Sequence, residues 1–421
     1  MRQAYKYRLY PNQTTEQQLR FVLNRCRELY NAALSERKDA YQQYQRTTVI
    51  AGQERTVAAM MVAGRSVKSI SFYGQKRDLV EIKQERSEYQ EIASHVLQDV
   101  LNRLDKAFSA FFRRIRNGET PGYPRFKGRN RYDSFTYPDG AGWRLTVEER
   151  REKLKGTLHL SRIGSINVNL HRPIEGRIKT VTIKREVDQW YVVFSCEVEA
   201  PEKLPVSYED VGIDLGVTHL ATLSTGEMIE HPRYYRKAQK TLEKRQQSLT
   251  RKRKGSHRRE RAKRLIGKAH RKIARQRRDF LHKASHKLVQ RYQVLVFEDL
   301  HISNLTRRPK PKQDEKGTYL PNGAAAKGGL NTSILDAGWG MFVGMCAVKA
   351  AEAGRTLLKV DPKFTSQICS RCGQVRKKDL SERWHQCDCG AELDRDVNAA
   401  INILDRGKQH LGGKRPTSET A

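Results

Sequence analysis

Apolar and polar positions alternate at the start of the chain and then change to a helical period. Residues 3–9 alternate and end before Pro11, which predicts a short strand. From Thr15 to about Arg116 apolar residues recur every three or four positions, which predicts packed helices. One stripe holds Leu19, Val22, Leu23, Cys26 and Tyr30, and another holds Ile92, Val96, Val100, Leu104, Phe108 and Phe112.

The segment from residue 117 to residue 129, NGETPGYPRFKGR, contains two prolines and three glycines and is unsuited to regular structure. Its aromatic and basic residues could stack on nucleic-acid bases and pair with a backbone. Tyr123, Arg125 and Lys127 are therefore candidate nucleic-acid contacts. The composition fits a plain linker between domains equally well.

Alternation returns between Ser134 and Glu199. Thr180–Ile183 and Trp190–Cys196 flank a polar turn at residues 187–189, which predicts a hairpin. Together with the N-terminal strand, these segments predict a small β-barrel. Residues 201–205 begin and end with proline and indicate the next boundary.

Two later strands carry acids among apolar residues. Asp214 is expected in the middle of a strand, between Ile213 and Leu215. A charge there costs several kcal/mol unless it is paired, so Asp214 is either part of a buried salt bridge or a metal ligand. Glu298 is the first polar residue after an apolar run, where a strand opens into a crevice. Asp299 should point to the opposite face.

Residues 233–291 form the most basic part of the chain, with 24 Lys and Arg against three acids, a balance of +21. An apolar stripe predicts an antiparallel helical hairpin with one packed face, formed by Leu265, Ala269, Ile273, Phe280, Ala284 and Leu288. A charge run is usually a solvated face, but this imbalance favours a phosphate-binding surface. The candidates at the turn are Arg251, Lys252, Arg253 and Lys254.

The pattern of apolar residues predicts the elements between residue 306 and the cysteines. Residues 306–331 are expected to be a loop. A helix is expected from about Ser333 to Ala353, followed by a short strand at Leu357–Val360. The tail after Gly407 lacks periodicity and is expected to fray.

Four cysteines form two close pairs, Cys369/Cys372 and Cys387/Cys389. Four thiolates in two chelating pairs suit one tetrahedral, structural Zn²⁺ ion. Gly373 and Gly390 follow the pairs and allow the backbone to turn. The second pair has one intervening residue where two are usual, and His385 is an alternative ligand. Arg371, between the first two cysteines, is a further candidate nucleic-acid contact.

A pair of acids begins the last predicted helix. Asp394 is the rival of Asp396 as a ligand, but it can instead be the N-cap of the helix. Converging carboxylates from Asp214, Glu298 and one of these acids would suit two Mg²⁺ ions, which prefer oxygen ligands.

Composition and net charge indicate which class of molecule the protein binds. The chain has 421 residues, 81 Lys and Arg, 47 Asp and Glu, and a net charge of +34. Such a charge opposes compaction unless a polyanion neutralises it, which favours nucleic acid over an anionic membrane. The N-terminal residues have no apolar signal core, and the clustered cysteines suit a reducing compartment. We therefore expect a cytoplasmic, nucleoid-associated protein in a prokaryote, or a nuclear protein in a eukaryote.

Several motifs together resemble the TnpB family of transposon-encoded RNA-guided DNA endonucleases, which is related to the compact type V CRISPR effectors. They are GIDLGVTHLAT (212–222), VLVFEDL (294–300), SQICSRCG (366–373) and DRDVNAAINI (394–403), with KAFSAFFRRIRNGETPGYPRFK (106–127) and DAGWGMF (336–342). The resemblance implies an α/β multidomain fold with a RuvC-like nuclease domain of RNase H fold. It implies Asp214, Glu298 and Asp396 as the catalytic triad, and it selects Asp396 over Asp394.

The resemblance also implies a domain plan. A wedge β-barrel would comprise residues 1–12 and 118–204, interrupted by a helical recognition module at 13–117. The nuclease would comprise 205–365 and 391–408 around a zinc-binding segment at 366–390, with a flexible tail at 409–421. The implied partners are a guide RNA from the transposon end and double-stranded target DNA with a short flanking motif. The alternatives are a nuclease-inactive RNA-guided repressor and a transposase accessory protein.

Overall fold

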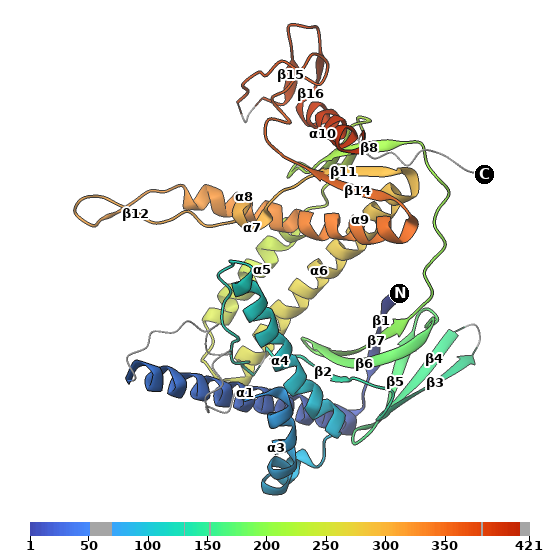
Figure 1. Ribbon diagram of the computed structural model, residues 1–421, viewed down its shortest axis with the longest axis vertical. Helices are drawn as coiled ribbons and strands as arrows, with labels where there is room; N and C mark the ends of the chain where they lie inside the picture. Colours follow the sequence, from blue (N-terminus) through green and yellow to red (C-terminus); the bar gives the residue numbers. More distant parts are fainter. Residues whose placement is uncertain (51–69, 130, 151–152, 380–381, 413–421) are drawn as a thin grey trace. The chain divides into compact units, whose positions relative to one another are not determined.

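The computed structural model describes residues 1–421 except 51–69, 130, 151–152, 380–381 and 413–421 (Figure 1). The chain divides into two compact units, Met1–Glu199 and Ala200–Ala421.

The first unit is built on one antiparallel sheet in the strand order β2-β6-β7-β1-β5-β4-β3. Its strands are β1 (Arg2–Tyr10), β2 (Ser134–Tyr137), β3 (Trp143–Arg150), β4 (Lys153–Leu160), β5 (Gly164–Leu170), β6 (Arg177–Glu186) and β7 (Gln189–Glu197). The predicted hairpin is confirmed, because β6 and β7 pair up to Glu186 and Gln189 on either side of the turn.

The sheet differs from the predicted barrel because its outer strands do not pair in the described part of the chain. Among the described residues it stays open, with β2 at one edge and β3 at the other. The N-terminal strand β1 belongs to this sheet, as predicted, and joins its two halves at the centre, between β5 and β7. Alternation along single strands indicates one buried face, but it does not specify whether the outer strands meet.

The helices of the first unit are α1 (Gln13–Ile50), α3 (Phe72–Glu85) and α4 (Ser94–Arg116), with a short 3-10 turn at Ser87–Tyr89. The two predicted stripes are confirmed as buried faces. They share one hydrophobic core with the sheet, which includes Leu19, Cys26, Val96, Leu104, Phe135 and Phe194.

The second unit contains a five-stranded mixed sheet in the order β10-β9-β8-β11-β14. Its strands are β8 (Asp210–Asp214), β9 (His219–Leu223), β10 (Met228–Glu230), β11 (Val294–Glu298) and β14 (Thr356–Val360). The strands β8, β11 and β14 run parallel, whereas β8, β9 and β10 are joined antiparallel.

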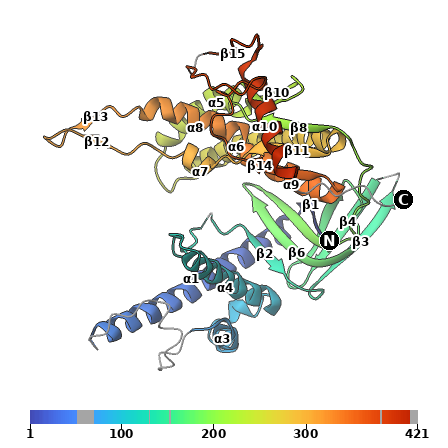
Figure 2. The ribbon, with the colours of Figure 1, turned by 45° about the horizontal axis from the view of Figure 1, so that its top comes forward.

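Helices and short hairpins surround this sheet (Figure 2). The helices are α5 (Tyr234–Thr250), α6 (His257–Arg291), α7 (Ile302–Leu305), α8 (Ala324–Ala337), α9 (Trp339–Ala353) and α10 (Arg395–Leu411). The small hairpins are β12 (Lys312–Gln313) with β13 (Tyr319–Leu320), and β15 (Trp384–Gln386) with β16 (Glu392–Asp394).

The predicted basic hairpin is α5 packed against α6. Its buried face was only partly predicted: Ile273, Ala284 and Leu288 are buried, but Leu265 is 42% exposed. Leu265 fits the helical period, but in this part of α6 the buried side chain is that of Ala262. The strongly basic sequence left few apolar positions to fix the phase of this stripe.

The predicted helix at 333–353 is two helices. α8 begins at Ala324, within the predicted loop, and Gly338 in the left-handed conformation separates it from α9. By length and hydropathy Ala324–Ala353 could cross a bilayer. However, Trp339, Phe342, Cys346 and Ala350 of α9 belong to the core of the second unit. At the C-terminus α10 continues to Leu411, and most of the predicted tail lies outside the described residues.

Candidate active site and metal centre

Neighbouring parallel strands bring two of the three predicted acids to one edge of the sheet. Asp214 is the last residue of β8 and Glu298 is the last residue of β11. The two strands pair in parallel, with Ile213 opposite Phe297. Asp214 therefore lies at a strand end and not mid-strand as the sequence predicts, because the chain leaves the strand at the following Leu215-Gly216.

The third acid comes from the helix α10, which lies directly on β8 (Figures 1 and 2). Gly212 makes this close approach possible, because a Cβ atom at this position would lie 2.0 Å from the backbone oxygen of Ala400. The helix can therefore lie close to the backbone of β8, and the first turn of α10 reaches the strand ends.

Asp394 and Asp396 have different roles at the start of α10. Asp394 is the N-cap, and its Oδ1 accepts hydrogen bonds from the amides of Asp396 (2.8 Å) and Val397 (3.2 Å). This capping orders the first turn, in which Asp396 lies. The carboxylate of Asp396 takes no part in the cap and is available for other partners.

The carboxylates of Glu298 and Asp396 are close enough to Asp214 to disfavour its ionisation. Burial raises the pKa of Asp214 well above its usual value, and the charges of Glu298 and Asp396 raise it further. Burial also raises the pKa of Glu298 and that of Asp396. A partly buried carboxylate that two neighbouring acids disfavour as an anion is a favourable environment for divalent cations with oxygen ligands.

A hydrogen-bond chain that the sequence analysis missed connects these acids with the cysteine segment. Thr365 Oγ1 donates to Glu298 Oε1 at 2.6 Å. Asn402 Nδ2 donates to the carbonyls of Thr365 (2.8 Å) and Ile368 (2.7 Å). Asn398 Nδ2 donates to Ile368 O, and its Oδ1 accepts from the amide of Ser370.

This chain fastens residues 365–370 to the helix that carries Asp396. Asn398 and Asn402 are both buried and one helical turn apart. Their spacing within an otherwise apolar helical run was a usable signal, since a buried amide needs partners.

The four cysteines form one compact group, with all four sulfurs within 4.8 Å of one another. The Sγ atoms of Cys369 and Cys389 are 3.7 Å apart, and those of Cys372 and Cys387 are 3.6 Å apart. A tetrahedral Zn²⁺ with Zn–S bonds of about 2.3 Å requires sulfur separations of about 3.8 Å. The residues therefore fit zinc, and the short Cys387–Cys389 spacing does not prevent the arrangement.

The surroundings of the cysteines favour a thiolate at Cys369, whereas hydrogen bonding among the four thiols raises the pKa of Cys372 to about 12. Gly373 and Gly390 have φ angles of +77° and +79°, which let the chain turn after each pair. Burial raises the pKa of the Cys369 thiol, but hydrogen bonds from the Cys372 amide and from His385 outweigh burial and lower the pKa to about 6. His385 is fully buried and lies outside the four-sulfur group.

The other sequence candidates differ in their surroundings. Tyr123 is partly buried and packs edge-on against Phe108 and Phe111, at 5.4 and 5.3 Å between ring centroids. Arg125 is exposed, and the Lys127 side chain lies over the ring of Tyr30. Tyr123 therefore has a packing role in this structure.

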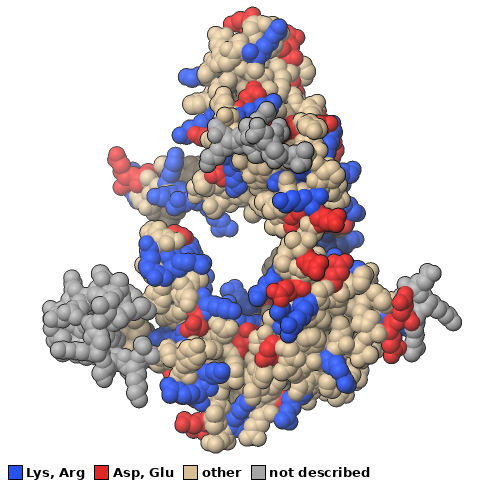
Figure 3. Space-filling model, turned by 45° about the vertical axis from the view of Figure 1, so that its right-hand side comes forward, with Lys and Arg blue, Asp and Glu red and all other residues tan. Residues whose placement is uncertain are grey.

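The basic candidates in the second unit lie at the surface. Arg251, Arg253 and Lys254 are exposed in the turn between α5 and α6, whereas Lys252 is half-buried and donates to Ser248. Arg371 is exposed beside the cysteines and donates to Cys389 O at 3.4 Å. Blue Lys and Arg side chains outnumber red acids on the molecular face in Figure 3.

Three family descriptions match parts of the chain. Residues 193–308 match a family described as "Probable transposase", and residues 339–403 match "Cas12f1-like, TNB domain". Residues 1–46 match "Helix-turn-helix domain", although the structure shows β1 followed by one continuous helix there.

Full-length relatives decide the family. A Streptomyces pristinaespiralis protein named "Putative RNA-guided DNA endonuclease" is 34% identical over 97% of this chain and 90% of its own length. The InsQ protein of Escherichia coli K12, with the same description, is 32% identical over 96% of this chain and 92% of its own length. The chain belongs to the TnpB family.

Solved structures show that the TnpB-family fold seen here extends to compact CRISPR effectors. A Cas12f1 chain from a complex with guide RNA and target DNA matches with a TM-score of 0.54 at 12% identity, over 93% of this chain and 83% of that one. The mini-RNA-guided endonuclease Cas_phi3 matches with a TM-score of 0.52 at 8% identity, over 100% and 94% of the two chains.

Proposed function

We propose that this protein is an RNA-guided endonuclease that hydrolyses phosphodiester bonds of target DNA with Asp214, Glu298 and Asp396 at the reacting centre. The observation that carries the proposal is the convergence of three carboxylates from β8, β11 and α10, of which Glu298 is buried and Asp214 and Asp396 are partly buried. Burial and then the charges of Glu298 and Asp396 raise the pKa of Asp214. Family membership supports the same activity, since the full-length relatives are named as RNA-guided DNA endonucleases.

The strand order of the second unit supports a RuvC-like domain of RNase H fold. Three antiparallel strands are extended by two strands parallel to β8, and Asp214 and Glu298 lie at the carboxyl ends of β8 and β11. Ligands of open α/β sheets bind outside the carboxyl ends of such strands.

The chain's own residues set up the reaction by holding negative charge in place. Asp214 and Glu298 are fixed by neighbouring strands, Asp396 is fixed by the capped first turn of α10, and Thr365 orients the Glu298 carboxylate. When bound by these oxygens, two Mg²⁺ ions would supply charge stabilisation for the attacking water and for the leaving oxygen. The four cysteines would hold one structural Zn²⁺ that keeps residues 366–390 ordered.

A guide RNA and a DNA duplex are the proposed partners. The large positive charge, of which +21 lies within residues 233–291, suits the backbones of both. Base pairing by the guide would select the target, and the protein would read a short motif beside it. A nuclease-inactive repressor is the alternative, but all three acids are present and close together, which favours the nuclease.

The test is to purify the protein with its RNA from expressing cells and sequence that RNA. Plasmids carrying a match to the variable part of the RNA, beside a library of flanking sequences, are then incubated with Mg²⁺. We expect cleavage only of matching plasmids with a subset of flanks, and none in EDTA. Absence of bound RNA, or equal cleavage of matching and non-matching plasmids, would contradict the proposal that RNA guides the cleavage.

A further inference from the structure

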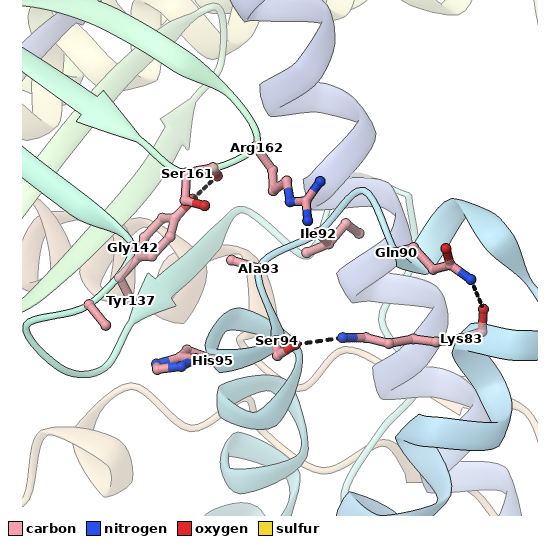
Figure 4. A pocket seen from close by; sticks show the side chains of 11 residues that line it. Lys83, Gln90, Ile92, Ala93, Ser94, His95, Tyr137, Gly142, Ser161 and Arg162 are labelled. Carbon is pink, nitrogen blue, oxygen red and sulfur yellow. Dashed lines mark hydrogen bonds between the residues drawn. The ribbon is translucent and has the colours of Figure 1, made fainter.

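The first unit contains a polar cavity of about 500 Å³ that none of the motifs described above explains (Figure 4). Its walls come from the end of α3, the segment before α4, the first turn of α4, β2 and the turn after β4. Lys83, Ser94, His95, Tyr137 and Arg162 are among the residues that line it. All these elements belong to Met1–Glu199, so the cavity lies within one unit.

The lining is cationic. Lys83 and Arg162 both face the cavity, and none of its described lining residues is an acid. Lys83 Nζ donates to Ser94 Oγ at 2.6 Å, a neutral partner that leaves its charge uncompensated. Burial lowers the pKa of Lys83, and the positive charge of Arg162 lowers it further, so the two cations are close enough to repel each other.

Arg162 is held in an unfavourable backbone conformation. Its φ angle is +65°, in the left-handed region that few residues with a side chain adopt. Among the described residues, none accepts a hydrogen bond from its guanidinium group or forms an ion pair with it. Arg162 lines the cavity and is exposed, so its guanidinium group is accessible to a ligand from outside the protein.

The N-terminus of α4 adds to the positive potential in the cavity. Ala93 is the N-cap of α4 and makes no side-chain hydrogen bond to the first turn. The positive end of the helix dipole therefore faces the cavity without a capping acceptor. The nearby acid Asp139 pairs with His95, at 2.6 Å between Oδ2 and Nδ1, and lies outside the lining.

We propose that this cavity binds a phosphate group of a nucleic-acid backbone, between Lys83 and Arg162. One phosphodiester charge would relieve the repulsion between the two cations and would supply the acceptor that Arg162 lacks. The cavity is open enough to admit a phosphate that remains part of a strand. The source of the phosphate rests on the proposed function, because the strand is either the guide RNA or the target duplex.

The test compares two double variants of the full-length protein. Lys83→Gln/Arg162→Gln removes both cavity cations. Lys106→Gln/Arg116→Gln removes the same two charge types from exposed positions of α4 outside the cavity. In one arm, nucleic-acid-free protein binds the RNA recovered from purified complexes. In the other arm, the protein–RNA complex binds a matching DNA duplex, and both affinities are measured as a function of salt concentration.

We expect the cavity variant to bind one of the two nucleic acids about tenfold more weakly than the control variant. Its salt dependence should be shallower by about 0.7 for single-stranded RNA or about 0.9 for duplex DNA, the loss of one phosphate contact. The arm that changes identifies the strand. Equal binding by the cavity and control variants in both arms would overturn the proposal.

Three further outcomes distinguish a wrong cavity assignment from a wrong proposed function, a misfolded variant or binding of a small phosphate. If wild-type protein binds neither nucleic acid, the proposed function fails and not only the cavity assignment. If Lys83→Gln/Arg162→Gln does not fold, Arg162→Gly replaces it, because glycine accepts the positive φ angle while the cation is removed. If inorganic phosphate raises the melting temperature of wild-type but not variant protein, and neither arm changes, the cavity binds a small phosphate and the backbone proposal is wrong.

Discussion

Thr365 Oγ1 donates a hydrogen bond of 2.6 Å to Glu298 Oε1, and both residues are buried. The bond stabilises the ionised carboxylate and counteracts the rise in the pKa of Glu298 that burial causes. It also joins the strand end of β11 to the segment that leads into the cysteines. Thr365 is therefore a positioning residue for the proposed active site.

Replacing Thr365 tests this role. Thr365→Val keeps the shape of the side chain but removes the donor, which should lower the single-turnover DNA cleavage rate by about ten- to a hundredfold. Thr365→Ser retains the hydroxyl and should stay within about threefold of wild type. Zinc content should be the same in both variants. Equal rates for the valine and serine variants would show that the hydrogen bond does not contribute.

Asn402 should contribute to stability through the two carbonyls that it satisfies. Asn402→Ala leaves the Thr365 and Ile368 carbonyls without this donor, at a cost of about 2 kcal/mol in the free energy of unfolding. The matched control is Gln409→Ala, an exposed amide on the same helix, which should change stability little. Urea titration of both variants gives the comparison. Similar stability of the two variants would argue against the hydrogen-bond chain as a structural tie.

Asp214 should destabilise the metal-free fold near neutral pH. Its pKa is higher in the folded than in the unfolded state, so the folded state binds more protons between the two values. The stability of metal-free protein should then fall as pH rises above the unfolded value of about 3.9. Asp214→Asn removes this loss, so in EDTA at pH 7 its melting temperature should exceed that of wild type by about 2 °C or more.

In Mg²⁺ the wild-type protein should have the higher melting temperature. Mg²⁺ stabilises wild type by binding the carboxylates, and it binds the Asp214→Asn variant more weakly. Asp299→Asn is the matched control, since Asp299 is half-exposed and pairs with Lys359. An Asp214→Asn variant that melts below wild type in EDTA would contradict the electrostatic account of the site.

The sequence indicated the candidate acids and cysteines of the second unit but not the hydrogen bonds that connect them. Asp214, Glu298 and the cysteines could be located because acids in apolar strands and paired cysteines are rare and have few explanations. Thr365 and Asn402 were not predicted because their partners, the Glu298 carboxylate and two backbone carbonyls, are brought close only by the tertiary fold. The exposed Leu265 and the early start of α8 at Ala324 show the same limit. Periodicity identifies a helix, but neighbouring elements decide its phase and ends.

The cysteine cluster should bind one zinc ion per chain. Cys369→Ser removes one of four ligands and should lower the zinc content of the purified protein to well below one per chain. Cys346→Ser is the control, because Cys346 is a buried residue of α9 outside the cysteine cluster. This variant can be less stable than wild type but should keep its zinc. Metal analysis by mass spectrometry separates these outcomes. Retention of zinc by Cys369→Ser would contradict the four-thiolate site.

The most direct test of the central claim compares Asp396→Asn with Asp394→Asn in guided cleavage of a matching plasmid with Mg²⁺. Both variants remove one carboxylate from the start of the same helix. Asparagine caps helices as well as aspartate does, so Asp394→Asn should retain the fold and a cleavage rate within about tenfold of wild type. Asp396→Asn should bind RNA and DNA normally and show no detectable cleavage. Cleavage by Asp396→Asn at the wild-type rate would contradict the assignment of the three carboxylates as the reacting centre.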